Sequence, residues 1–477
     1  MSGDAGLEDA QPDRFVHSSL ALLASSAASA VLGVTFWAVA AHLYPARLVG
    51  YGAAEIAAMT FLGGIALLNL GTVFPRFLFP AGSRAGLVLG AGYAASMSIA
   101  LVAGILFITV TGHHTFLPPG APSALFFIGA VVLWVVFTIE DAALVGFRRT
   151  FWVPVENIGF SIGKIALLPV FAALAPRAGV FNSWVAPVIV CVLGVNAYLF
   201  FKVLPEHLRR SRGRGEIPAR RVIRSVVMGE YLGGLSFMAM TSLPALIIVS
   251  RLGPRQAAYF QTPWLAGTSF DMLLFAVATS LIVEASVRPT AASETVRRAV
   301  RLAILLLTPC LVVLVVGAPY FLRVLGAQYA THGTALLRLV ALALPFMAVN
   351  VLYVTYARLA RRVRRVLAIQ VGIAATVLTL TVVLLDRFGI AGAGLAFLIG
   401  QAAASFVVFP SVFRQYRRPG MAPHYPGGAV LVARGAATPG VGPEGASMRS
   451  DGAARRDRAI GTERPRVTRW PWGHKTG

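Results

Sequence analysis

The sequence predicts an all-α polytopic membrane protein, with twelve transmembrane helices arranged as two pseudo-symmetric six-helix bundles. Its 477 residues are 57% hydrophobic and only 13% charged, and the mean hydropathy of +0.73 is too high for a water-soluble domain. The apolar residues form runs of about 20, which is the length that spans hydrocarbon as a helix. Helices are required because lipid cannot satisfy backbone hydrogen bonds, and no period-two pattern indicates a barrel.

The twelve apolar runs are divided equally by a basic segment at 202–224. The first six predicted spans lie at about 20–41, 49–71, 86–111, 122–146, 153–175 and 180–201. The other six lie at about 225–249, 258–285, 301–322, 333–357, 365–385 and 390–413. We therefore expect a first bundle over 20–201 and a second bundle over 225–413.

The two terminal segments differ in composition from the bundles. Residues 1–19 begin with an acidic stretch and lack a signal-peptide cleavage pattern, so the first apolar run is expected to remain as a helix. Residues 414–477 are rich in Pro, Gly, Ala and Arg, and offer too little apolar surface to offset the entropy of ordering. We predict a cytoplasmic N-terminal segment and a disordered, basic cytoplasmic tail.

Basic residues gather on one side of the predicted membrane. The segment 202–224 carries eight Lys or Arg in 23 residues, and each would cost about 2.5–3.5 kcal/mol at the centre of a membrane helix. This segment and the loops on the same side of the predicted membrane carry 21 basic residues, whereas the loops on the opposite side carry six. The positive-inside rule places this side and both termini in the cytoplasm. The basic segment is interpreted as a solvated run that sets topology, with anionic lipid headgroups as accompanying partners.

Three landmarks recur between the halves at nearly one offset, namely 209, 213 and 210 residues. Their agreement indicates duplication of a six-helix unit. An even number of spans per repeat gives both halves the same orientation, and transporters built this way place their site between the halves. The matching landmarks are His42 with Arg251, Arg148 with Arg361, and Arg177 with Arg387.

Short motifs follow one another in the order seen in a known transporter family. In the first half they are His42-Leu43-Tyr44-Pro45, Gly50-Tyr51, Leu70-Gly71, Phe74-Pro75-Arg76-Phe77 and Gly146-Phe147-Arg148-Arg149. In the second half they are Arg251-Leu252-Gly253, Ala258-Tyr259, Leu336-Leu337-Arg338 and Gly389-Ile390-Ala391-Gly392-Ala393. Over 20–413 the chain resembles the polysaccharide and lipid-oligosaccharide flippases of the multidrug/oligosaccharidyl-lipid/polysaccharide exporter superfamily.

This resemblance implies a particular architecture and mechanism. It implies two six-helix bundles around a central cavity, and passage of an undecaprenyl-linked sugar by alternating access. The predicted span at 20–41 has none of the charged residues that lipid II flippases and several O-antigen flippases keep there. No site residues are therefore transferred from the family to this chain.

Signatures of other functions are missing from the sequence. No GxxxxGK[ST] motif occurs, so the chain carries no ATP-driven motor and no cofactor is expected. His113-His114 is interpreted as part of a turn, and Cys191 and Cys310 as small core residues, so no metal site is predicted. The net charge is +23, but the basic residues lie between apolar runs, so nucleic acid is not an expected partner. Short external loops disfavour a membrane-embedded glycosyltransferase or polymerase, and we expect a transporter rather than an enzyme.

Ionisable residues inside the predicted spans are the best candidates for a binding site. Charges are costly in hydrocarbon, so they face a cavity or a partner. Lys164 and Asp271 lie near mid-depth in opposite repeats, and we expect them to face a shared aqueous cavity between the halves. Glu55 and Glu230 are further candidates for substrate binding, with interfacial carboxylates that reach water as the alternative interpretation.

Each of the two central candidates has a predicted role. Lys164 would attract a diphosphate as a compact cation, and Asp271 would neutralise it in the empty site or carry a coupling proton. A purely structural ion pair is the alternative. Two further charged pairs, Glu140-Asp141 and Arg148-Arg149, lie close to the membrane face and are interpreted as pairing with each other.

The sequence therefore predicts a flippase that moves a polyprenyl-diphosphate-linked saccharide across the bacterial cytoplasmic membrane. It would serve polysaccharide biosynthesis, such as that of lipopolysaccharide or exopolysaccharide. A polysaccharide polymerase or glycosyltransferases would be its partners. The excess of Arg over Lys indicates a GC-rich bacterial genome. The alternatives are a multidrug/cation antiporter of the same superfamily and a non-transporting partner of a polysaccharide export complex.

Overall fold

A computed structural model describes residues 31–111, 117, 120–211, 220–270, 274, 292–359 and 362–417. The chain divides into two units, Met1–His424 and Tyr425–Gly477, and the second lies wholly outside the described residues. The predicted N-terminal segment, the His113-His114 loop and nearly all of the predicted tail also lie outside them. Every regular element in the described part of the chain is helical.

The first half contains ten helical elements among the described residues. They are a helix over Val31–Leu43, α2 (Ala46–Ala66), α3 (Leu70–Phe77), η1 (Gly82–Arg84), α4 (Ala85–Thr111), α5 (Ala121–Gly146), α6 (Trp152–Leu174), α7 (Gly179–Tyr198), the π-helix η2 (Leu199–Val203) and α8 (Leu204–Ser211). The predicted second span, 49–71, is thus divided in two. Leu68 and Asn69 have positive φ between α2 and α3, a backbone conformation that interrupts a right-handed helix.

The second half continues the helical pattern. Its elements are α9 (Arg220–Leu252), α10 (Pro254–Thr268), α12 (Ala292–Arg323), α13 (Ala327–Leu359), α14 (Val363–Phe388) and α15 (Ile390–Arg417). Part of the basic segment 202–224 is helical as well, because η2 and α8 extend the sixth predicted span to Ser211 and α9 begins at Arg220. Most of the predicted eighth span beyond α10 lies outside the described residues.

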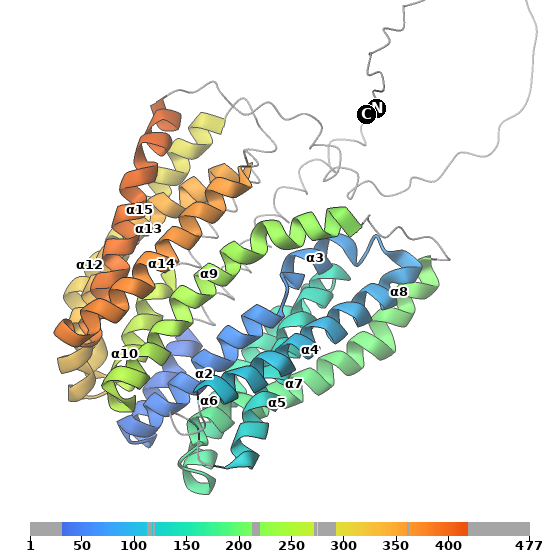
Figure 1. The fold of residues 1–477 in the computed structure, drawn as a ribbon, viewed down its shortest axis with the longest axis horizontal. Helices are drawn as coiled ribbons and strands as arrows, with labels where there is room; N and C mark the ends of the chain where they lie inside the picture. Colours follow the sequence, from blue (N-terminus) through green and yellow to red (C-terminus); the bar gives the residue numbers. More distant parts are fainter. Residues whose placement is uncertain are drawn as a thin grey trace, which may run out of the picture. The chain divides into compact units, whose positions relative to one another are not determined.

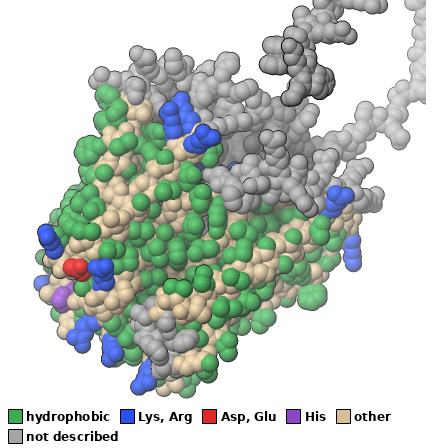
Figure 2. Space-filling model, viewed as in Figure 1, with side chains coloured by type: hydrophobic (Ala, Val, Ile, Leu, Met, Phe, Trp, Pro, Cys, Tyr) green, Lys and Arg blue, Asp and Glu red, His purple; other side chains and the backbone are tan. Residues whose placement is uncertain are grey.

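The described helices have the length and composition of membrane spans. Nine of those in the described ranges are long and apolar enough to cross a bilayer, and two shorter apolar helices cover Val31–Leu43 and Leu307–Arg323. Figure 2 shows hydrophobic side chains over a broad part of the drawn face, with Lys and Arg near its ends. Large apolar side chains such as Leu106, Val190 and Val407 are exposed, as expected for a surface that faces lipid.

The helix α2 joins the two halves. In its most apolar stretch 67% of the residues are buried, the largest share among the nine candidate spans that the structure describes. Figure 1 shows α2 beside α9 and α10 of the second half, and it packs against both. Tyr231 on α9 donates a hydrogen bond to the backbone oxygen of Ile65 at 2.6 Å. The halves are therefore in direct contact along α2.

Polar pairs, one buried and one exposed, also connect the helices of the second half. Asn350 on α13 donates hydrogen bonds to the backbone oxygen and to Oε1 of Gln401 on α15, at 2.9 and 2.8 Å. At one end of the bundle Arg251 and Asp386 form an exposed ion pair at 3.1 Å. The buried amide pair sets the register of α13 on α15, because an unpaired buried amide costs about 1–3 kcal/mol.

The predicted topology can be tested on exposed turns. Cys191 and Cys310 are first replaced by alanine, and a single cysteine is then introduced at Arg177, between α6 and α7, or at Arg364, at the start of α14. Both positions are exposed. We expect a membrane-impermeant maleimide to label the cysteine at 177 in intact cells and the one at 364 only after lysis. The reverse pattern would contradict the predicted orientation.

Candidate functional site

Lys164 lies inside the first half, surrounded by aromatic rings. It projects from α6 and is only 4% exposed. Its Nζ lies 3.8 Å from the ring centroid of Trp184 on α7, 4.7 Å from that of Phe160 and 5.3 Å from that of Phe36. Contacts of a cation with ring faces at these distances are attractive, by about 2 kcal/mol or more once water is excluded.

The rings around Lys164 belong to a larger aromatic cluster. Trp184 contacts Phe36, Phe160 and Trp134, and its own Nε1 is buried without a hydrogen-bond partner. No carboxylate of the described residues lies within ion-pair distance of Lys164. The first half thus holds a buried lysine amine whose cationic form is stabilised by ring faces, with no negative group beside it in the described part of the chain.

The other predicted binding residues are placed less completely. Glu55 lies on α2 and is 3% exposed, so the interpretation as an interfacial carboxylate that reaches water does not fit this residue. Glu230 lies on α9, but its side chain is not among those that the structure describes. Asp271 lies outside the described residues. The shared cavity for Lys164 and Asp271 therefore stays a prediction.

A second buried polar group lies between α4, α5, α6 and α7. Glu140 is fully buried and accepts a hydrogen bond from Nδ2 of Asn196, whose Oδ1 accepts one from the Tyr93 hydroxyl at 2.9 Å. Asp141 accepts a hydrogen bond from Asn157 at 3.0 Å. Glu156 is 6% exposed, and its carboxyl group lies near enough to that of Glu140 for the two to share a hydrogen bond when one of them is protonated.

The carboxyl groups of Glu140, Asp141 and Glu156 interact electrostatically. Several carboxylates in a low-dielectric space repel one another, so a group of this kind binds protons, or a cation, more readily than exposed carboxylates do. We call these three residues the carboxyl cluster. The side chains of this cluster can exchange protons, but the described residues hold no group of three or more such side chains that could bind a metal ion, whereas a protonated Lys164 attracts anions.

Sequence reasoning missed this cluster, although a signal for it was present. Glu140 and Glu156 lie eight residues before and after Arg148, in the turn that joins α5 to α6. Residues about equally far from such a turn face each other in an antiparallel helix pair, and Asp141 and Asn157 likewise lie eight residues before and after Arg149. The predicted pairing of Glu140-Asp141 with Arg148-Arg149 is wrong, because Arg149 instead pairs with Glu206 on α8 at 2.8 Å.

Comparison with known proteins shows the fold. No family model and no curated protein sequence matches the chain. Among solved structures it is similar to an inward-facing multidrug resistance MATE family transporter of the MOP superfamily, with a TM-score of 0.58, 16% identity, and 80% of this chain and 94% of that one covered. The outward-facing conformation of a MATE family transporter matches with a TM-score of 0.54, 15% identity, and 83% and 96% covered.

A further match is the lipid II flippase MurJ in an inward closed conformation, with a TM-score of 0.53, 13% identity, and 83% and 89% covered. The chain has the fold of a MOP superfamily transporter. The predicted fold class, an all-α polytopic membrane protein of two helical bundles, is thereby confirmed. At these identities the likeness carries no information about the substrate.

Proposed function

We propose that the chain is a flippase that moves a polyprenyl-diphosphate-linked saccharide across the cytoplasmic membrane by alternating access. The observation that carries this proposal is the buried amine of Lys164, which faces aromatic rings and has no carboxylate beside it in the described part of the chain. An intramembrane charge of this kind marks a substrate path in membrane transporters. A diphosphate would supply the negative charge that the site lacks.

The fold is compatible with this substrate class. A solved structure with the same fold is described as a lipid II flippase, which shows that two bundles of this type can move a lipid-linked substrate. A bacterial cytoplasmic location, both termini in the cytoplasm, and a polymerase or glycosyltransferases as partners belong to the same proposal. A membrane-embedded glycosyltransferase or polymerase is the less favoured alternative, because the external loops that the sequence predicts are short.

The carboxyl cluster favours a second candidate function, that of a multidrug/cation antiporter. Glu140, Asp141 and Glu156 place negative charge or exchangeable protons inside the first half. Such a group can couple transport to a proton gradient, and it can also attract a cationic drug. The solved MATE transporters with this fold are described as multidrug resistance proteins.

The two functions are separated by reconstituting the purified chain in liposomes. We expect a fluorescent polyprenyl-diphosphate saccharide to reach the opposite leaflet faster than in protein-free liposomes, at a rate that a cationic dye does not reduce. Dye efflux driven by a proton or sodium gradient, with no movement of the saccharide, would reject the flippase and establish the antiporter.

A pH measurement tests whether the carboxyl cluster couples transport to protons. We expect the wild-type transport rate to depend on the pH difference across the liposome membrane. Glu156→Gln should remove that dependence, because an amide cannot exchange a proton, while the variant keeps its helical fold. Asp386→Asn is the matched control, since it neutralises an exposed carboxylate in the second half. Equal pH dependence in wild type and Glu156→Gln would contradict the coupling role.

A further inference from the structure

A cavity of about 1070 Å³ lies at the end of the first half that the loop charges assign to the cytoplasm. It lies where α5 ends and where η2 passes into α8. We call it the arginine pocket, and it is separate from both the carboxyl cluster and the ring-enclosed Lys164. The residues of its wall that carry the argument are Phe79, Phe147, Arg148, Arg149, Glu206 and Arg210.

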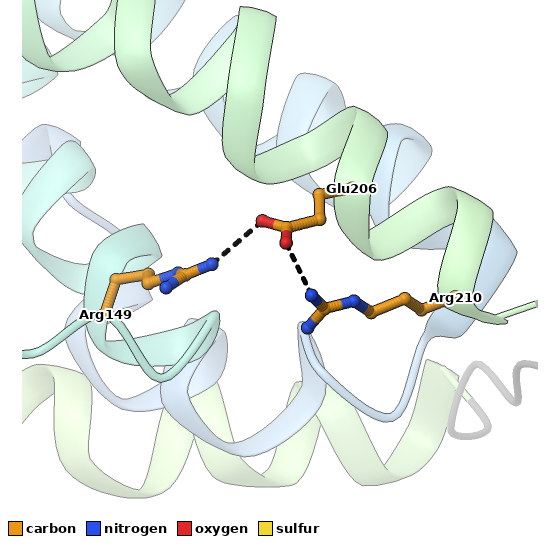
Figure 3. A network of polar contacts seen from close by, with 3 residues as sticks. All are labelled: Arg149, Glu206 and Arg210. Atoms are coloured by element: carbon orange, nitrogen blue, oxygen red, sulfur yellow. Dashed lines mark hydrogen bonds and ion pairs between the residues drawn. The ribbon is translucent and has the colours of Figure 1, made fainter.

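The arginine pocket has an excess of positive charge. Three guanidinium groups line it with a single carboxylate, that of Glu206. Figure 3 shows this carboxylate between two of them, with Oε2 at 2.8 Å from Arg149 and Oε1 at 2.6 Å from Arg210. A guanidinium group has five N–H donors in a planar fork, so most donors of these arginines remain free for an anion.

Arg148 reaches the pocket from an unfavourable backbone conformation. Its φ is +62°, and it follows the C-cap of α5, the position at which most helices that end this way have glycine. The backbone N–H of Arg149 bonds to the oxygen of Leu144 at 2.8 Å, and that of Arg148 to the oxygen of Val145 at 3.0 Å. This cap directs two successive arginines to the pocket, at a cost that glycine would avoid.

The helix before α8 is also irregular. Residues Leu199–Val203 form a π-helix directly before α8, and its last residue, Val203, lines the pocket. A π-helical turn shifts the residues that follow it relative to a regular α-helix, and such turns are frequent at functional sites. Here it precedes the helix that carries both Glu206 and Arg210.

Aromatic side chains also line the arginine pocket. Phe79 is 39% exposed, and the guanidinium carbon of Arg148 lies 4.2 Å from its ring centroid. Phe147 adds a second ring to the lining. Phe147 is buried, at 6% exposed, but an anion without an apolar part would leave the exposed ring of Phe79 in contact with water, whereas the glycerol and upper acyl chains of a lipid would cover it.

We infer that the arginine pocket binds the phosphate group of an anionic membrane lipid. The phosphate would accept hydrogen bonds from Arg148, Arg149 and Arg210, and Phe79 would contact the apolar part next to the headgroup. Glu206 holds two of these arginines in place while the pocket is empty. This binding does not require that the chain is a flippase or an antiporter.

The test measures the thermal unfolding midpoint, Tm, of the full, delipidated chain in detergent. It is titrated with phosphatidylglycerol, with phosphatidylcholine of the same acyl chains, or with inorganic phosphate. A ligand that binds only the folded protein raises Tm with concentration. We expect phosphatidylglycerol to act at lower concentrations than either other ligand. Equal action by phosphatidylcholine would overturn the anionic specificity, and equal action by inorganic phosphate would overturn the lipid assignment.

Variants connect the effect to the pocket. Arg210→Gln removes an exposed side chain, so the fold should be retained, and we expect the half-saturating lipid concentration to rise about tenfold, as for the loss of one charge-assisted hydrogen bond. Arg148→Gly should also weaken binding, although it relieves the backbone. Arg364→Gln, an exposed arginine at the start of α14, is the matched control and should bind as wild type does.

A substitution that is expected to strengthen lipid binding distinguishes a binding site from a purely structural network. Glu206→Gln removes the one carboxylate that competes with a lipid phosphate, so it should lower the half-saturating concentration while it loosens the empty pocket. Weaker lipid binding in Glu206→Gln would overturn the proposal, as would wild-type lipid binding by both Arg210→Gln and Arg148→Gly.

Discussion

Lys164→Met is expected to abolish transport of the lipid-linked saccharide while leaving the helices folded. Methionine has a similar length and no charge, and replacing a buried charge by an apolar group of similar volume is often neutral or stabilising. The variant should therefore be recovered from membranes in wild-type amounts. The flipping rate should fall by at least roughly thirtyfold, because losing one charge of a buried pair costs about 2 kcal/mol or more.

The measurement is the liposome assay with the fluorescent saccharide, with the amount of folded protein determined by size-exclusion chromatography. Lys202→Met is the matched control, since Lys202 is exposed in η2 and its Nζ lies 5.8 Å from a single ring, that of Tyr198. The control should transport as wild type does. If Lys164→Met folds and also transports at the wild-type rate, Lys164 has no role in recognising the substrate.

Gly50→Ala is expected to destabilise the contact between the two halves. A Cβ at Gly50 on α2 would lie 1.7 Å from the backbone oxygen of Pro254, where α10 begins. Backbone cannot move aside as a flexible side chain can, so α2 and α10 must separate. Overpacking costs about 1–3 kcal/mol at ordinary sites, and we expect about 3 kcal/mol or more here.

The expected result is a lower temperature at which Gly50→Ala loses its monodisperse size-exclusion peak. Gly129→Ala on α5 is the matched control, because a Cβ there meets nothing within 4 Å. In an open helical position alanine is favoured over glycine by about 0.5–1 kcal/mol, so the control should be equal to wild type or slightly more stable. A wild-type melting profile for Gly50→Ala would show that the halves do not approach so closely at this point.

The helical fold could be predicted from composition and from the length of the apolar runs. The predicted spans at 86–111, 122–146 and 153–175 end within two residues of α4, α5 and α6, because each boundary is a local change from apolar to polar residues. The predicted span at 49–71 did not anticipate the break after α2. Backbone conformation at Leu68 and Asn69 decides that break, and hydropathy does not detect it.

The candidate site could be predicted only in part. The cost of a charge in hydrocarbon is enough to select Lys164 and Glu55 from the sequence, and both are buried in the structure. Their surroundings depend on which helices pack together. Trp184 reaches Lys164 from the next helix along the chain, and Phe36 reaches it from a helix more than a hundred residues earlier.

The sequence by itself determined the helical class of the protein and the approximate position of the spans that the structure describes. These follow from the free energy of moving each residue from water into lipid, which is a property of local composition. Only the tertiary structure decided that Glu156 interacts with Glu140, and that Arg149 forms its ion pair with Glu206 and not with the carboxylates near it in sequence. A charged side chain pairs with whatever group packing brings within a few ångströms, and that distance is set by the arrangement of helices.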